Sequence, residues 1–124
     1  MLIVDDSPEM VDRVADVLSP ACEIVGTVGN GPAALDAVVA LQPDVIVLDI
    51  SMSGMTGLEV ASCVRRAGSN AAIVFLTMHA DPNVLSAAQS AGGIGYVIKP
   101  RLDLDLLCAV EYARAGHTFV SPLF

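Results

Sequence analysis

The chain has 124 residues, the length of a single domain, and 54% of them are hydrophobic, which is enough for a sizeable core. Six basic against 14 acidic side chains give a net charge of −8, which disfavours direct contact with the phosphate backbone of a nucleic acid. Charged residues, proline or glycine interrupt every apolar stretch before the roughly 18 residues that a membrane span needs, so we expect no membrane contact.

Short runs rich in β-branched residues alternate with longer helical stretches along the chain. The first strand is predicted over residues 2–4. Residues 7–9 (Ser-Pro-Glu) are typical of a helix start, with a capping serine, a proline in the first turn and an acid near the positive end of the dipole. A second strand is predicted over residues 23–28, and a helix over residues 33–41 that a proline ends.

The second half of the chain continues this alternation. A strand over residues 45–48 is apolar at every position, which is typical of a strand covered on both faces. Five strands and five helices in strict alternation predict an α/β fold with one doubly wound parallel sheet and right-handed crossovers. The site of such a sheet lies beyond the carboxyl ends of its strands. The remaining strands are predicted at residues 73–76 and 95–98, and the remaining helices at 56–67, 82–91 and 104–115.

Acidic residues stand where two of the predicted strands end. Asp5 and Asp6 follow the first strand, and Asp49 follows the third. A single acid there is commonly a turn or helix cap. If the two strands are neighbours, however, carboxylates about 4 Å apart repel by roughly 4 kcal/mol at an effective dielectric of about 20, and a cation must offset this. Oxygen ligands without histidine or cysteine suit Mg²⁺, with Mn²⁺ as the alternative.

A hydroxyl group and an ammonium group stand at the ends of the next two strands. Thr77 follows the fourth strand, and Lys99, the one lysine of the chain, follows the fifth. Taken alone, each has an ordinary explanation as a strand former or a solvated side chain. Together with the acids and a metal, they suit a site that places a phosphoryl group on a carboxylate. Asp49 is the best candidate acceptor, since it follows the most apolar strand.

In this order and spacing the motifs resemble the receiver domain of two-component response regulators, over essentially the whole chain. The matching segments are residues 2–6, 49–59, 76–77 and 95–100. The resemblance implies the flavodoxin-like strand order 2-1-3-4-5. The end of the chain is similar to the receiver end in regulators of the LuxR, or NarL-FixJ, type.

The resemblance also implies the roles of the acids. Asp49 would accept a phosphoryl group from a partner sensor histidine kinase. Asp6 and Asp49 would bind Mg²⁺ directly, together with the backbone carbonyl of Ser51, while Asp5 would act largely through water.

Further roles concern the phosphoryl group and the switch. Thr77 would hydrogen-bond the phosphoryl group, and Lys99 would bridge it to Asp49. Tyr96 would be the switch aromatic whose rotamer reports the position of Thr77. The peptide bond before Pro100 would be cis.

The implied function is signalling without an enzymatic activity of its own, apart from weak self-phosphorylation from small donors and autodephosphorylation. We expect a cytoplasmic protein, in which three cysteines without Cys-x-x-Cys spacing stay reduced. Phosphorylation would shift a two-state equilibrium of the face built from residues 82–91, 95–98 and 104–115, and a homodimer would form through the same face.

The predicted domain organisation is a receiver over residues 1–116 and a tail over residues 117–124. The tail would begin a linker to a DNA-binding output domain outside this chain, through which the protein would control transcription. A regulator that works as a single domain is the alternative.

Two positions depart from the family pattern. Ser53 stands where the family usually has proline, so the loop around it loses a fixed φ and is expected to be more mobile. Met78 stands where the family prefers a small residue, and its flexible side chain is expected to cover part of the approach to the acceptor.

Three rival functions stay open. A phosphorylation-independent receiver acting as a protein-interaction module would keep the fold without Mg²⁺-dependent labelling. A flavodoxin-like cofactor binder needs a phosphate loop after the first strand, where Asp5 and Asp6 would repel the ligand. A phosphotransferase or phosphatase with an aspartyl intermediate uses the same carboxylate chemistry, but no cap domain or substrate pocket is evident in so short a chain.

Overall fold

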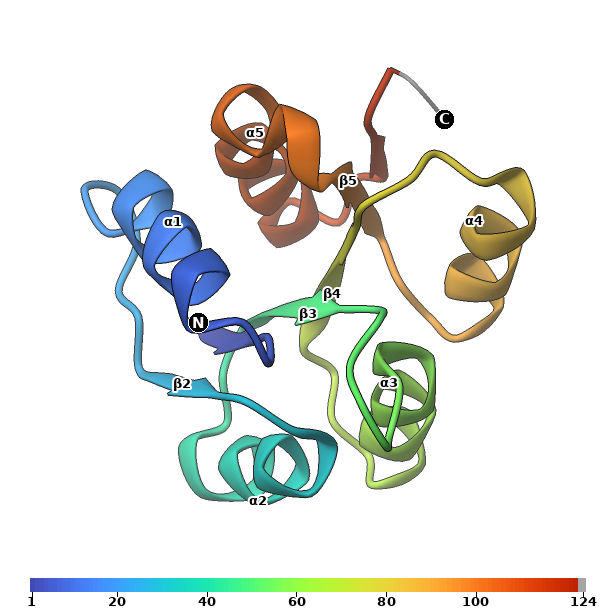
Figure 1. The fold of residues 1–124 in the computed structure, drawn as a ribbon. Helices are drawn as coiled ribbons and strands as arrows, with labels where there is room; N and C mark the ends of the chain where they lie inside the picture. Colours follow the sequence, from blue (N-terminus) through green and yellow to red (C-terminus); the bar gives the residue numbers. More distant parts are fainter. Residues whose placement is uncertain (123–124) are drawn as a thin grey trace.

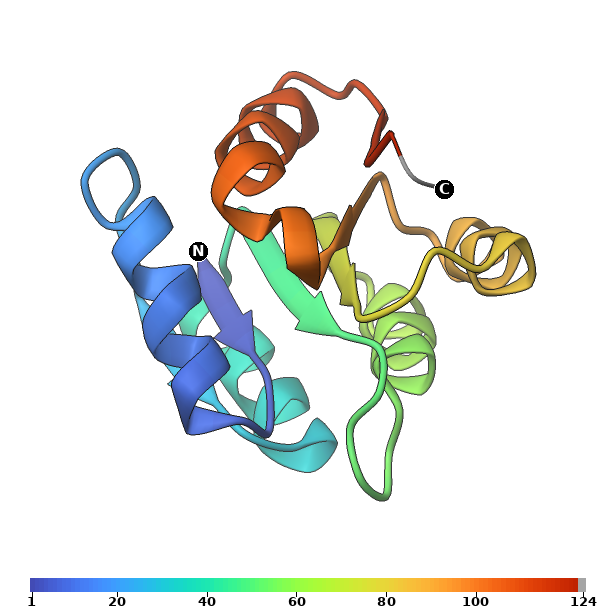
Figure 2. The ribbon, with the colours of Figure 1, turned by 45° about the horizontal axis from the view of Figure 1, so that its top comes forward.

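A computed structural model describes residues 1–122 as one parallel sheet with helices on both faces (Figure 1). The sheet has the order β2-β1-β3-β4-β5-β6, so its first five members follow the predicted order. In Figure 2 the arrowheads of β1 and β3 lie next to each other, which places their carboxyl ends at one edge. The strands are β1 (Leu2–Val4), β2 (Gly26–Val28), β3 (Val45–Asp49), β4 (Ala72–Thr77), β5 (Gly95–Ile98) and β6 (Phe119–Val120).

The helices divide between the two faces of the sheet. α1 (Pro8–Leu18) and α5 (Leu102–Arg114) cover one face, whereas α2 (Gly31–Leu41), α3 (Gly57–Arg66) and α4 (Pro82–Ser90) lie on the other (Figure 1). Alternate residues of β3 enter the two cores, so the strand is buried on both sides. This double burial explains why its sequence is an unbroken apolar run.

Short polar side chains fix the helix starts near the carboxyl edge of the sheet. Ser7 accepts a hydrogen bond from the Met10 amide at the start of α1. Thr56 and Glu59 form a capping box at the start of α3. Each such cap satisfies backbone donors that the first helical turn leaves without partners. The turns that carry the strand-end residues are thereby held in place.

The prediction of five strands is wrong, because a sixth, β6, pairs with β5. Phe119 lies opposite Gly95 and Val120 opposite Tyr96, in parallel register. After α5 the chain turns at Gly116, whose φ of 79° is in the left-handed region that favours glycine. Two residues are too few to carry a periodic strand signal, so the sequence does not reveal β6. The last two residues of the predicted tail, 123–124, lie outside the described residues.

Other boundaries shift by a few residues. β2 begins at Gly26 rather than at residue 23. A 3₁₀ turn over Lys99–Arg101 leads into α5, which begins two residues earlier than predicted. The implied cis bond before Pro100 is wrong: no peptide bond within residues 1–122 is cis. The trans form is the intrinsically favoured one for a bond to proline, by about 0.5–1 kcal/mol.

Within residues 1–122, no helix combines the length and the apolar character that crossing a membrane requires.

Candidate functional site

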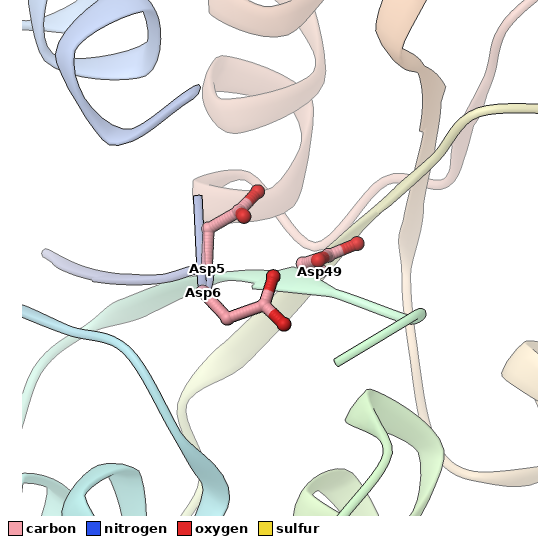
Figure 3. Close-up of side chains that lie close together, drawn as sticks. All are labelled: Asp5, Asp6 and Asp49. Carbon is pink, nitrogen blue, oxygen red and sulfur yellow. The ribbon is translucent and has the colours of Figure 1, made fainter. Parts of the chain in front are cut away.

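Three carboxylates meet at the carboxyl edge of the sheet, as the sequence predicts. β1 and β3 are paired neighbours, so Asp5 and Asp6 after β1 lie beside Asp49 at the end of β3. One carboxyl oxygen from each lies within 4.8 Å of the others. Figure 3 shows Asp5 and Asp6 turning to different sides of the chain, with the Asp6 carboxylate reaching toward Asp49. Asp5 and Asp49 are buried, and Asp6 is exposed.

Within residues 1–122, Lys99 supplies the one positive charge in contact with this group. Its Nζ lies 3.1 Å from Asp5 Oδ2 and 3.2 Å from Asp49 Oδ1. The lysine side chain is itself nearly buried, so both ion pairs lie largely out of water. Three carboxylates against one ammonium group leave two formal negative charges on the cluster. This arrangement calls for a further cation.

The pKa of Asp49 reflects this excess of negative charge. Burial raises the pKa, and the nearby charge of Asp5 raises it further. The charge and hydrogen bond of Lys99, together with the Ser51 amide that donates to Asp49 Oδ1 at 3.2 Å, lower it but do not cancel the increase. Lys99 alone therefore does not compensate the charge of the cluster.

The donor set fits a hard divalent cation. Asp5 Oδ2 is buried and accepts no hydrogen bond, because Lys99 Nζ approaches it without the alignment that a hydrogen bond needs. A buried carboxylate oxygen without a donor is costly unless something else coordinates it. All three side chains offer oxygen, the ligand type that Mg²⁺ and Mn²⁺ prefer.

The loop between β3 and α3 closes over the acids. The Ser53 amide donates to Asp6 Oδ2 at 3.2 Å, a hydrogen bond that a proline at this position would lack. Gly57 approaches the end of β3 so closely that a Cβ atom there would overlap the Asp49 carbonyl. With serine at this position, the loop lacks the fixed φ of a proline, but the Ser53 amide hydrogen-bonds to Asp6, a candidate metal ligand.

Thr77 is the last residue of β4 and pairs with Ile98, the last residue of β5, which directly precedes Lys99. The Thr77 side chain is buried, and its hydroxyl donates to the His79 carbonyl at 3.4 Å. The side chain of Met78 between them is 50% exposed. The structure therefore places Thr77 at the predicted edge, with its hydroxyl engaged by its own loop.

Tyr96 lies inside the domain rather than at the rim of the site. Its ring stacks on Phe75 with centroids 6.3 Å apart, and its hydroxyl donates to the Gly93 carbonyl. Burial raises the pKa of the Tyr96 hydroxyl to about 12. The side chain thus links β5 to the segment that follows α4, and its hydroxyl bonds to Gly93, whereas the Thr77 hydroxyl bonds to His79.

Sequence reasoning missed two buried polar residues beside β5. Asp105 of α5 and Ser121 after β6 are at most 5% exposed and hydrogen-bond to each other. A signal for Asp105 was available, because it falls on the helix stripe that carries Leu102, Leu106 and Ala109. No comparable signal marks Ser121.

A hollow also lies at the opposite, amino edge of the sheet, between the ends of α2 and α3. Val38, Gln42, Ala67 and Ala71 contribute to its lining. The hollow contains no cluster of carboxylates and no lysine. Of these two places in the described chain, the acid cluster is therefore the better candidate for the functional site.

Comparison with known proteins identifies relatives of the whole arrangement. The model of the response regulator receiver domain matches residues 1–111. The nitrate/nitrite response regulator protein NarP of Escherichia coli (strain K12) is 38% identical over 118 residues, covering 94% of this chain and 54% of that protein. NarL of the same strain is 32% identical over 123 residues, covering 98% and 57%.

A solved structure gives the same result for the fold. The two-component response regulator of the LuxR family from Aurantimonas sp. SI85-9A1 matches with a TM-score of 0.92 at 27% identity, covering 98% of this chain and 88% of that one. The chain spans somewhat more than half the length of the curated relatives NarP and NarL.

Proposed function

The chain belongs to the response regulator receiver domain family, and we propose that it is the phosphoacceptor of a two-component pathway. A sensor histidine kinase would donate the phosphoryl group. The bond between phosphorus and the imidazole nitrogen breaks as a carboxylate oxygen of Asp49 bonds to phosphorus. The observation that carries this proposal is the cluster of three carboxylates facing the Lys99 ammonium group.

Asp5, Asp6 and Asp49 are the side chains that would hold Mg²⁺, or Mn²⁺ in its place, with the carbonyl of Ser51 as a further ligand. When bound, the cation supplies charge neutralisation for the phosphoryl oxygens. The residues of this chain do the rest: they present the acceptor, orient it and keep it ionised.

The two oxygens of Asp49 have different surroundings. The contacts from Lys99 Nζ and from the Ser51 amide both fall on Oδ1. Oδ2 receives neither, so we assign it as the oxygen that attacks phosphorus. Lys99 favours the ionised carboxylate, opposing the burial that raises the pKa of Asp49, and so keeps the nucleophile in its reactive form.

Thr77 and Tyr96 are the proposed switch residues. The hydrogen bond from Thr77 to the His79 carbonyl is long at 3.4 Å, so a phosphoryl oxygen on Asp49 would compete for the hydroxyl with a stronger, charged acceptor. Turning the Thr77 hydroxyl toward that oxygen would free the loop that leads into α4. Tyr96 is held by its stack on Phe75 and by its hydrogen bond to the Gly93 carbonyl, and its rotamer would change when Thr77 moves.

Intact-mass measurement after incubation with Mg²⁺ and acetyl phosphate or phosphoramidate tests the proposal. We expect the parent to gain a phosphoryl mass and Asp49→Asn to gain none. Asp36→Asn is the matched control, because Asp36 is an exposed acid on α2, and it should label like the parent. Labelling of Asp49→Asn at the parent's rate would overturn the assignment of the acceptor.

The same experiment separates the alternative function. A phosphorylation-independent receiver that acts only as a protein-interaction module would show no Mg²⁺-dependent mass gain in any variant. The buried ion pair of Lys99 and Asp49 favours the phosphoacceptor, because a module that only binds other proteins does not require charged groups at a buried strand end.

The cellular setting rests on the relatives. NarP and NarL are nitrate/nitrite response regulator proteins, and each is longer than the match to this chain. We therefore propose a cytoplasmic receiver that controls transcription through a DNA-binding output domain. We further propose that it forms a homodimer through the α4-β5-α5 face, where Leu104 and Tyr112 are 70% and 49% exposed. Its own chemistry would be limited to weak self-phosphorylation and autodephosphorylation.

A further inference from the structure

A chain of hydrogen bonds, buried at Ser121 and partly buried at Arg101, joins Arg101, Asp105 and Ser121 and is here called the C-terminal relay. The Ser121 hydroxyl donates to Asp105 Oδ2 at 2.8 Å. The Arg101 guanidinium contacts both Asp105 oxygens, with Nε 2.8 Å from Oδ2 and Nη2 3.3 Å from Oδ1. Asp105 and Ser121 are 5% and 1% exposed. The relay lies on the α5 side of β5 and shares no residue with the acid cluster.

The C-terminal relay holds the segment 98–101, which carries Lys99, at both of its ends. On one side of Lys99, the Ile98 amide donates to the Ser121 hydroxyl at 3.1 Å. On the other side, Arg101 is held by Asp105. Because Ser121 bonds both Ile98 and Asp105, this one hydroxyl connects the two ends of the turn from which the lysine projects.

The position of Ser121 depends on β6. Its own amide donates to the Tyr96 carbonyl at 2.8 Å, continuing the pairing of β6 with β5. The hydroxyl therefore reaches Ile98 and Asp105 when the C-terminal strand is docked. If the strand leaves, the Ile98 amide and the buried Asp105 carboxylate each lose a partner, which is the costly outcome for buried polar groups.

We propose that Ser121 is a positioning residue for Lys99, and that the C-terminal relay couples docking of β6 to the geometry of the acid cluster. Ser121 lies next to the last described residue, Pro122, so the C-terminal end of the described residues is tied to the lysine that bridges Asp5 and Asp49. The meaning for signalling rests on the proposed function, whereas the positioning of Lys99 does not.

Coupling of this kind is reciprocal. A ligand on Asp49 that moves Lys99 changes the free energy of docking β6 by the same amount as β6 docking changes the affinity for that ligand. Phosphorylation would therefore change the docking of β6, along a path that needs neither the Thr77 hydroxyl nor the Tyr96 ring.

Chemical modification of Lys99 tests the positioning without phosphorylation or metal. Lys99 is the one lysine of the chain, so its rate of acetylation by an N-hydroxysuccinimide ester, read on its own peptide by mass spectrometry, reports how well burial and the two ion pairs protect its amine. We expect Ser121→Ala to raise this rate by about threefold to tenfold, the equivalent of one net hydrogen bond. Ser121→Thr keeps the hydroxyl and should restore the parent rate.

Two controls separate positioning from general effects. Ser62→Ala removes an exposed hydroxyl on α3 and should leave the rate unchanged. Val38→Ala removes core volume on the opposite face of the sheet, and so loosens the fold without touching the relay. A Ser121→Ala rate equal to that of the parent, or equal to that of Val38→Ala, would overturn the proposal.

The coupling has its own measurement in the parent protein. With Mg²⁺ and beryllofluoride, we expect hydrogen exchange at the Ile98 and Ser121 amides to change by more than about threefold, while amides of α2 stay constant. If beryllofluoride binds and these two amides do not respond, the coupling is wrong even though the phosphoacceptor assignment stands. If Asp49 fails to label, the proposed function is wrong, and the Lys99 acetylation rates still decide the positioning.

Discussion

The two helices that flank β5 are attached to the sheet in different ways. α5 buries six of its 13 residues, five of them apolar core residues such as Leu106, whereas α4 buries one of its nine, Ala88. The α5 flank also carries the C-terminal relay. The α4 flank instead continues into Gly92, which has a φ of 92°, and into Gly93, which packs against Phe75.

This difference indicates where the domain can change shape. Local stability follows buried apolar contact, so α4 should open at a lower free energy than α5. A change at Asp49 would therefore displace the α4 flank more readily than the α5 flank, which more buried residues and the C-terminal relay hold in place.

The largest expected effect compares one leucine from each flank. Leu106→Ala deletes a fully buried side chain of α5 and should lower the free energy of unfolding by about 2–5 kcal/mol. Leu85→Ala deletes a half-buried side chain of α4 and should cost less than about 1.5 kcal/mol. Urea denaturation of both variants gives the two values. Equal losses would remove the distinction between the flanks.

The next effect concerns the acid sensitivity of the relay. Burial by itself would raise the pKa of Asp105, but the hydrogen bonds from Arg101 and Ser121 and the charge of Arg101 bring it below the usual value of 3.8. A lowered pKa stabilises the fold above the unfolded-state pKa, and this stabilisation is lost as the pH falls through the folded-state pKa.

Asp105→Asn should therefore cost about 1.5–3 kcal/mol at pH 7, and the difference from the parent should shrink as the pH falls below about 4. Unfolding measured at several pH values gives the curve. Asp103→Asn is the control, since Asp103 is an exposed acid two residues away in the same first turns of α5. A gap between parent and Asp105→Asn that widens in acid would contradict the assigned sign.

The acid cluster and the relay also differ in how far the sequence reveals them. Asp5, Asp6 and Asp49 end strands whose apolar runs are unmistakable, and parallel strands bring their ends to one edge, so the cluster could be predicted before any coordinates. Thr77 and Lys99 are located by the same rule.

No comparable topological rule predicts the C-terminal relay. Its parts depend on a two-residue strand and on a serine whose neighbours in space lie 16 and 23 residues away in the chain. Asp105 illustrates the remaining difficulty: it lies close to Asp103 in sequence, yet one carboxylate is buried and the other exposed. Helical periodicity places Asp105 on the buried face of α5. That pattern alone does not predict which residues donate hydrogen bonds to the buried carboxylate and so offset the cost of its burial.

Gly93→Ala examines the joint between α4 and β5. An added Cβ would overlap the Phe75 ring and lie 3.2 Å from the Ala88 carbonyl oxygen, so the Phe75–Tyr96 stack must shift. We expect a loss of about 1–3 kcal/mol in the free energy of unfolding, with a changed near-ultraviolet circular dichroism of the aromatic groups. At Gly29 an added Cβ would meet its nearest neighbour at 3.7 Å, so Gly29→Ala is the control. An unperturbed Gly93→Ala spectrum would mean that the joint tolerates displacement.

The smallest expected effect lies where the α4 flank meets the acceptor. The Met78 side chain follows Thr77 and is half-exposed, and the sequence predicts that it covers part of the approach to Asp49. If Asp49 is the phosphoacceptor, Met78→Ala should label with acetyl phosphate about twofold to fivefold faster than the parent, a barrier change below about 1 kcal/mol. Met78→Leu keeps the bulk and should stay near the parent rate. Equal or slower labelling of Met78→Ala would show that this side chain does not obstruct the donor, and that access to Asp49 is set by the Thr77 hydroxyl and its loop instead.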